Sequence, residues 1–302
     1  MISSHYDDMI YGRILRYFCL LFVLFISVTS CEKFTSDQEI PAYLSIDSIY
    51  LSTIFSAQGT SSQRITDAWV YVDDEFLGAY ELPAKLPVLQ SGKHQVKIWP
   101  GIKKNGIAAT RTSYDFYNPV TKEVTFVPDS AARIGVLSTT YQTKTLFVWM
   151  ENFEDPRAIT LDTLNGSSAY IRDTLTGSPP PFEGSRSGAV VLDSVHDFFE
   201  CQTHLQYAIP YAPIYLEMNF KTTNPLVVGV VTYGTTTLYQ SPIITLNPTG
   251  GQWKKIYIDL STTLNAYSGM TTYRVYLRAL KDSGLKQSTI LIDNFKVVTR
   301  KS

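Results

Sequence analysis

The sequence predicts an all-β protein made of two β-sandwiches that follow a short N-terminal segment. Tyr (20 residues) and Phe (15 residues) are abundant in the 302-residue chain, and with many Thr and Val they favour strands over helices. Stretches that alternate apolar and polar residues recur between turn-forming residues, which is the pattern of half-buried strands. Apolar residues make up 44% of the chain and charged residues 18%, so its length and composition allow two hydrophobic cores.

Residues 1–30 have the pattern of a cleaved signal peptide. Arg13 and Arg16 precede an apolar run over residues 17–28. This run is shorter than the roughly 20 apolar residues that a membrane-spanning helix needs, and its length is typical of a signal peptide. The alternatives are a buried core helix and an uncleaved transmembrane anchor. Asp7 and Asp8 precede the arginines, which is unusual for the basic start of a signal peptide. Translation therefore starts either at Met1 or at Met9, and a chain that starts at Met9 lacks both acidic residues.

The run ends in Val-Thr-Ser followed by Cys31, which resembles the lipobox of bacterial lipoproteins. The resemblance implies that cleavage falls before Cys31 and that this residue carries several acyl chains (palmitate type), enough for stable anchoring. Residues 31–40 then form a tether. The acidic stretch Glu32–Glu39 is similar to the segment that directs Bacteroidetes lipoproteins to the cell surface, which implies a lipid-anchored protein of the bacterial outer membrane. Whether it occupies the periplasmic or the surface leaflet stays open.

The first sandwich is expected over residues 41–135. Its strands are predicted over Ala42–Leu51, Ala68–Val72, Phe76–Tyr80 and His94–Trp99. We expect Trp69 and Trp99 to belong to its core. The stretch VYVDDEFLGAYELPAKLPVLQSGKHQVKIWP resembles a PEGA-type or similar small module of bacterial envelope proteins, and this resemblance implies an Ig-like β-sandwich.

The second sandwich is expected over residues 145–300. Its main strands are predicted over Ile214–Lys221, Leu226–Tyr233, Thr237–Thr245, Lys254–Leu260, Tyr273–Leu280 and Ser288–Thr299. Four phrases occur in an order that resembles the galactose-binding-like jelly-roll modules of carbohydrate-binding families. They are Phe153–Asp155, Gly184–Val190, Gly251–Trp253 and Leu291–Asn294. The resemblance implies a jelly-roll β-sandwich and indicates the fold better than the function.

A candidate ligand face follows from the alternation in two of these strands. It consists of Tyr215, Glu217, Arg274, Tyr276 and Arg278, which could share one sheet face. Sugars stack on aromatic rings while polar side chains bond their hydroxyl groups, so this set of residue types suits a glycan. The alternative is a solvated sheet face whose tyrosines are ordinary strand residues.

Metal ligands are sparse. In several jelly-roll carbohydrate-binding families the first and last strands share a structural calcium, and the resemblance points to Glu154, Asp155 and Asp293 as its oxygen ligands. The alternative is ordinary carboxylates at turns and strand edges. We expect no other cofactor. His196, Glu200 and His204 recur every four residues, but on a strand that interval spans about 13 Å, too far for one ion.

The chain lacks HExxH, P-loop and paired CxxC motifs, and Gly184–Gly188 carries Arg186 where a nucleophile elbow needs serine. A net charge of -1 without a basic run argues against nucleic acid. Cys201 is expected to be a buried, unpaired residue.

The first functional hypothesis is therefore a non-catalytic outer-membrane lipoprotein that docks with, or forms part of, an envelope protein assembly. Its partners would be the membrane and other envelope proteins. The alternative is a surface glycan-binding lipoprotein that captures polysaccharide. A glycan hydrolase is a third hypothesis, because some β-jelly-roll hydrolases also use Asp and Glu.

Overall fold

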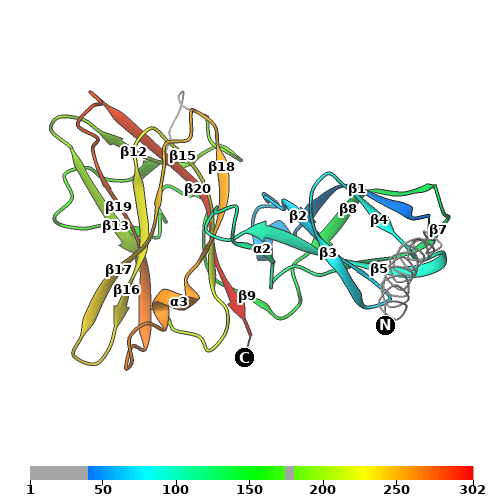
Figure 1. Cartoon of the computed structure of the whole chain (residues 1–302). Coiled ribbons are helices and arrows are strands. Elements are labelled where there is room, and N and C mark those ends of the chain that lie inside the picture. Colours follow the sequence, from blue (N-terminus) through cyan, green and yellow to red (C-terminus); the bar gives the residue numbers. More distant parts are fainter. Residues whose placement is uncertain (1–39, 174–179, 302) are drawn as a thin grey trace, which may run out of the picture. The chain divides into compact units, whose positions relative to one another are not determined.

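The computed structural model describes residues 40–173 and 180–301, and almost all of its regular structure is strand (Figure 1). Residues 42 onward form one compact unit. The expected signal peptide, the expected lipid attachment site Cys31 and most of the expected tether lie outside the described residues. Among the described residues, no helix is both long and apolar enough to span a bilayer.

The first sandwich has two sheets. The three-stranded sheet has the order β4 (Ala84–Val88), β1 (Ala42–Ser52), β8 (Ala131–Thr140). The five-stranded sheet has the order β3 (Glu75–Glu81), β2 (Asp67–Val72), β5 (Gly92–Lys103), β6 (Arg111–Ser113), and β7 (Val120–Phe126) also pairs with β5. One short helix, α2 (Phe55–Gln58), follows β1.

Local sequence explains these elements. In β1 the buried Leu44 and Ile46 alternate with partly exposed residues, as expected for a strand with one face in a core. The turn from β2 to β3 is formed by Asp73 and Asp74, whose φ angles of 48° and 67° suit the primed turns of tight hairpins. β1 pairs with β4 in antiparallel and with β8 in parallel orientation.

The second sandwich also has two sheets, which are the two layers of strands in Figure 1. The β19 sheet has the order β10 (Leu161–Thr163), β13 (Phe198–Thr203), β19 (Thr272–Leu280), β16 (Leu226–Tyr233), β17 (Leu238–Leu246), and β14 (Tyr207–Ala208) pairs with β19. The β20 sheet has the order β11 (Arg172–Asp173), β12 (Gly188–Leu192), β20 (Ser288–Arg300), β15 (Tyr215–Thr222), β18 (Lys254–Asp259), and β9 (Thr145–Glu151) pairs with β20. Helix α3 (Ser261–Leu264) follows β18.

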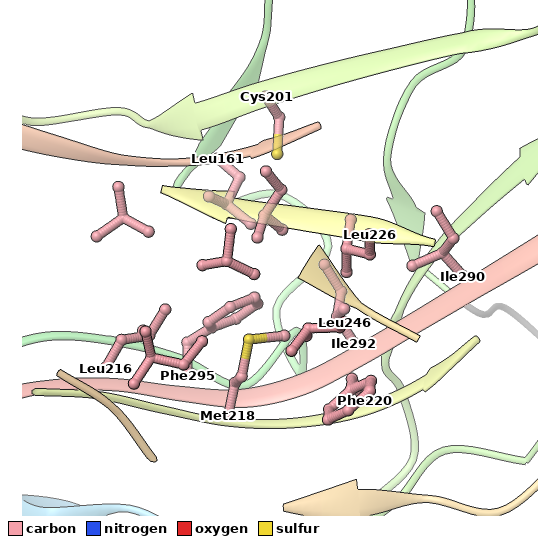
Figure 2. Close-up of a cluster of buried hydrophobic side chains, with 14 of the residues drawn as sticks. Leu161, Cys201, Leu216, Met218, Phe220, Leu226, Leu246, Ile290, Ile292 and Phe295 are labelled. Carbon is pink, nitrogen blue, oxygen red and sulfur yellow. The ribbon is translucent and has the colours of Figure 1, made fainter. Parts of the chain in front are cut away.

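The core of the second sandwich fills the space between its two sheets. Figure 2 shows side chains of both sheets meeting there, with Met218 and Phe220 from β15 and Cys201 from β13. Cys201 is a free, fully buried cysteine, and burial raises the pKa of its thiol. The predicted alternation of β15 places Leu216, Met218 and Phe220 in this core. The predicted fold class, an all-β protein of two successive sandwiches, is confirmed.

Candidate functional site

The five residues of the candidate ligand face lie on two different sheets. Tyr215 and Glu217 belong to β15 in the β20 sheet, whereas Arg274, Tyr276 and Arg278 belong to β19 in the β19 sheet. Each set points away from the sandwich core, so the two sets lie on opposite outer faces of the sandwich. The expectation of one shared face is wrong, because alternation within a strand does not tell which sheet the strand joins.

Glu217 is fully buried where the second sandwich meets the first. Its Oε1 accepts hydrogen bonds of 2.8 Å from the Tyr114 hydroxyl and 2.9 Å from the Tyr141 hydroxyl. Two lysines of the second sandwich complete this junction cluster: Lys255 Nζ lies 3.1 Å from Glu217 Oε2, and Lys296 Nζ donates to the Tyr141 hydroxyl at 3.3 Å. The expected solvated face of β15 is instead covered.

The electrostatics of the junction cluster balance two opposed effects. Burial acts to raise the pKa of Glu217, but Lys255, Lys296 and the Tyr114 hydroxyl together hold that pKa below its ordinary value. Burial lowers the pKa of Lys296 to about 7, although Glu217 acts against this, and Lys296 Nζ also donates to the Thr60 carbonyl at 2.6 Å. The Glu217 carboxylate is thus buried among its partners and inaccessible to a ligand, and the cluster positions the two sandwiches.

Two further tyrosines extend the junction. The hydroxyls of Tyr117 and Tyr257 are 3.0 Å apart, and the Tyr257 hydroxyl accepts a bond of 3.0 Å from the backbone N–H of Arg64. The rings of Tyr114 and Tyr257 lie 4.9 Å apart. Burial raises the pKa of all three tyrosine hydroxyls, and the charge of Glu217 acts in the same direction.

The outer face of the β19 sheet carries the other predicted residues, but side chains close over it. Tyr276 is only 2% exposed. Arg278 Nε lies 3.3 Å from Oε1 of Glu200, and Gln240 from β17 also donates to Glu200. Arg274 donates to the backbone carbonyls of residues 203 and 204. The tyrosine ring is therefore covered and provides no open stacking surface.

The predicted calcium ligands have separate hydrogen-bond partners. Glu154 accepts from the backbone N–H and hydroxyl of Ser185, at 2.9 and 2.6 Å, whereas Asp155 accepts from the N–H of Arg157 at 3.0 Å. Asp293 is buried and accepts from the N–H of the next residue at 2.7 Å. Burial raises the pKa of Asp293 to about 7, and nearby carboxylates, Glu154 among them, add to this effect.

Within residues 40–173 and 180–301, no group of three or more His, Cys, Asp or Glu is placed to hold a metal ion. Asp155 is engaged in its own turn, so the three predicted ligands do not form one donor set. Calcium binding stays a prediction. His196 and His204 are similarly separate, because they pair with Asp193 and Asp162 respectively.

An open aromatic surface lies on the first sandwich instead. Trp69 and Tyr71 of β2 point to the outer face of the five-stranded sheet, because Ala68, Val70 and Val72 fill the core. Phe76 of β3 stacks near both, with ring centroids 5.6 Å from Trp69 and 5.0 Å from Tyr71, and it is 47% exposed. Trp99 of β5 is directly opposite Trp69 in the strand register.

This aromatic surface leads into a cleft of about 710 Å³, here called the aromatic cleft. Tyr71 and Trp99 line it, and polar residues form much of the remaining wall: Asp115, Asn118, Gln142, Lys144 and Arg300. Asn118 Nδ2 donates to the Tyr141 carbonyl at 3.2 Å and Gln142 Nε2 donates to the Tyr117 carbonyl at 3.0 Å. Arg300 lies 3.8 Å from the Asp115 carboxylate. The two amide hydrogen bonds orient the side chains of Asn118 and Gln142.

The prediction that Trp69 and Trp99 belong to the core is wrong, since both are half-buried on the outer face. The signal was present in the sequence. In β5, Val96 and Ile98 take the core positions, so alternation places Trp99 on the other face with Lys97. The size and hydrophobicity of tryptophan favoured the core, but its position in the strand decided otherwise.

No family model and no curated protein matches the sequence. A solved carbohydrate-binding module of the β-sandwich superfamily is 12% identical, with 76% of this chain and 84% of that chain covered and a TM-score of 0.34. The CBM22-2 xylan-binding domain of Paenibacillus barcinonensis Xyn10C is 15% identical, covering 51% of this chain and 99% of that chain, with a TM-score of 0.35. TmCBM61, solved with β-1,4-galactotriose, is 11% identical, covering 50% and 94%, with a TM-score of 0.33.

Proposed function

We propose that this protein is a lipid-anchored glycan-binding protein that captures polysaccharide without cleaving it. The observation that supports this best is the aromatic cleft, in which Tyr71 and Trp99 lie beside amide, carboxylate and cationic side chains. Aromatic rings pack against the apolar faces of sugar rings, and planar polar groups bond the hydroxyls at the ring edge. The first hypothesis from the sequence, a docking subunit, has weaker support.

The aromatic cleft is suited to an extended ligand. Beyond Tyr71 and Trp99, the two rings that line the cleft, Trp69 and Phe76 continue the aromatic surface along the outer face of the sheet. Asn118 and Gln142 use their amide nitrogens to bond backbone carbonyls, which orients each side chain before a ligand arrives. Groups that are already held in place lose little conformational entropy on binding.

A glycan array with the full chain in detergent, followed by calorimetry with the best oligosaccharide, tests this proposal. Trp99→Ala is expected to lower affinity about tenfold or more. Lys144→Met, at an exposed position, removes a polar wall group without disturbing a core and is expected to weaken binding as well. The matched control is Trp253→Ala, since Trp253 is half-buried against Phe182 in the second sandwich and lines no part of this cleft.

Absence of binding to every glycan on the array would contradict the proposal. So would a ligand whose affinity is unchanged in both cleft variants. A thermal melt of each variant separates loss of binding from loss of fold.

Membrane anchoring at Cys31 is part of the same proposal, supported by the signal-peptide pattern and the lipobox-like tetrapeptide. Cys31→Ser is expected to abolish palmitate labelling and to release the chain from the outer-membrane fraction. Cys201→Ser is the control, because this buried thiol is expected to take no lipid. Retention of the label in the Cys31 variant would reject the assignment.

A docking role is a second candidate, favoured by one apolar surface. Ile54 and Phe55 are 66% and 55% exposed, and Phe55 and Met150 line a small cleft of about 230 Å³. Co-purification from detergent-solubilised membranes tests it. A partner that is retained by the native chain and lost with Phe55→Glu would support docking, and a chain that purifies alone would argue against it.

A further inference from the structure

A second cleft, of about 450 Å³, lies beside Tyr257 and is lined by basic side chains. Arg64 and Lys103 come from the first sandwich, and Lys254 and Lys255 come from β18 of the second. No aspartate or glutamate of the described chain is among its lining residues. We call it the basic cleft. Its charge contrasts with the chain as a whole, whose formal net charge is -1.

Only half of these charges are neutralised by a neighbour. Lys103 lies 3.1 Å from Glu81, and Lys255 is the buried partner of Glu217. For Arg64 and Lys254, the described residues place no carboxylate within ion-pair distance. The cleft is therefore lined by two positive charges that no described carboxylate neutralises, and these attract an anion.

Apolar residues and the turn around Asn105 form part of the remaining wall. Phe220 and Ile256 line it, and both are buried residues of the β20 sheet. The turn that carries Asn105 is attached to β18 by two bonds of 2.8 Å, from Asn105 N–H to the Tyr257 carbonyl and from Asp259 N–H to Asn105 Oδ1. Charges beside apolar walls act through a lower effective dielectric than charges in open water, which strengthens their attraction for an anion.

We infer that the basic cleft binds an anionic group carried on a sugar, a carboxylate or a sulfate, so that the captured glycan is acidic. The charges of Arg64 and Lys254 would pair with the oxyanion, beside the apolar part of the wall that Phe220 and Ile256 form. The volume lies within the range of small-ligand sites. This inference deepens the proposed function, because the carrier of the anion is taken to be a glycan.

The basic cleft and the aromatic cleft are neighbours. Tyr257 lines the basic cleft, Tyr114 lines the aromatic cleft, and their rings are 4.9 Å apart. The tyrosine pair thus separates a site for neutral sugar faces from a site for charge. Each cleft can be disabled without removing a residue of the other.

The test uses two matched polymer pairs with the full chain: dextran sulfate against dextran, and polygalacturonate against its methyl ester. The double variant Arg64→Met with Lys254→Met is expected to lose about tenfold or more in affinity for a charged polymer and to leave binding of a neutral polymer unchanged. The control Lys85→Met with Lys286→Met removes two exposed positive charges that line neither cleft, and is expected to bind like the native chain. The two pairs distinguish a sulfate from a carboxylate.

Equal affinity for charged and neutral members of both pairs would overturn the inference, and so would equal losses in the test and control variants. Trp99→Ala distinguishes this failure from failure of the proposed function. If neutral glycan binds and Trp99→Ala removes it while charge has no effect, only the inference fails. If no polymer binds, titration with glucuronate and with galactose 6-sulfate still tests the basic cleft: binding that the double variant loses supports it, and absence of binding rejects it.

Discussion

The hydroxyl of Tyr114 donates a hydrogen bond of 2.8 Å to Oε1 of Glu217, which lies 103 residues later in the chain, and both residues are fully buried. One belongs to the first sandwich and the other to the second. This bond is the centre of a cluster in which two lysines supply the countercharge. The junction between the sandwiches is therefore formed by specific side-chain contacts, and substitutions of these residues are expected to change the free energy of unfolding.

Glu217→Gln is expected to destabilise the protein by about 3–5 kcal/mol, because it leaves Lys255 and Lys296 without their buried countercharge. Urea denaturation measures the free energy of unfolding. Glu123→Gln is the matched control: it removes an equal charge from an exposed pair with Lys93, and no measurable change is expected. Equal stability of the two variants would contradict a structural role for Glu217.

Tyr114→Phe and Tyr141→Phe are each expected to cost about 1–3 kcal/mol, since each removes one donor to the same carboxylate. The two changes should not be additive, because the hydroxyls share Oε1 of Glu217. A double-mutant cycle from denaturation curves measures this coupling. A coupling energy of zero would show that the two bonds act independently.

Asp293→Asn is expected to stabilise the protein at pH 8 and to have little effect at pH 4. The folded-state pKa of Asp293, about 7, is above its ordinary value of 3.8, so the folded state binds more protons between these pH values. Stability conferred by the protonated form is complete at low pH and is lost as the pH rises through about 7. Asparagine carries no charge at any of these pH values, so the variant does not lose stability in this way. We therefore expect its Tm at pH 8 to be roughly 2–6 °C higher than that of the native chain.

The same variant, Asp293→Asn, also tests the predicted calcium site. If the predicted ion binds near Asp293, calcium is expected to raise the Tm of the native chain at pH 8 and not that of Asp293→Asn. An unchanged Tm of the native chain in saturating calcium would remove calcium from consideration. Magnesium at equal concentration is the control for ionic strength.

Gly229→Ala is expected to destabilise the β19 sheet by about 1–3 kcal/mol. A Cβ atom at this position would lie 2.4 Å from the Ser241 carbonyl oxygen and 2.5 Å from Cε1 of Tyr276, and both atoms are held within the sheet. Gly166→Ala is the control, because a Cβ there meets nothing within 4 Å. Thermal melts of both variants check this prediction. Equal melting temperatures would mean that Tyr276 can move away from Gly229.

The sequence predicted individual strands better than the relationships between them. Alternation in β19 correctly placed Arg274, Tyr276 and Arg278 on the outer face, opposite the core residues Val275, Leu277 and Ala279, because the side-chain period of a strand is a local property. It also placed Glu217 on the outer face of β15, but it could not predict that the first sandwich would cover that face. The surface that covers Glu217 is determined by contacts between residues far apart in the sequence, 103 positions for Tyr114 and 76 positions for Tyr141.

The candidate site was missed for a related reason. The aromatic cleft combines residues of β2 and β5 with Gln142 and Lys144 from a connection and Arg300 from the C-terminal strand. No local motif joins such positions. Only the outward position of Trp69 and Trp99 could have been found in advance, by giving the alternation of their strands more weight than the size of the indole ring.

The parallel pairing of β1 and β8 determines how this protein would carry load. A pull on the chain before Ala42 and after Thr140 acts at the start of β1 and at the end of β8. These ends lie at opposite extremes of a ladder that runs from Tyr43 to Ser52. Tension then shears the ladder along its length, so its hydrogen bonds must fail together rather than unzip one after another.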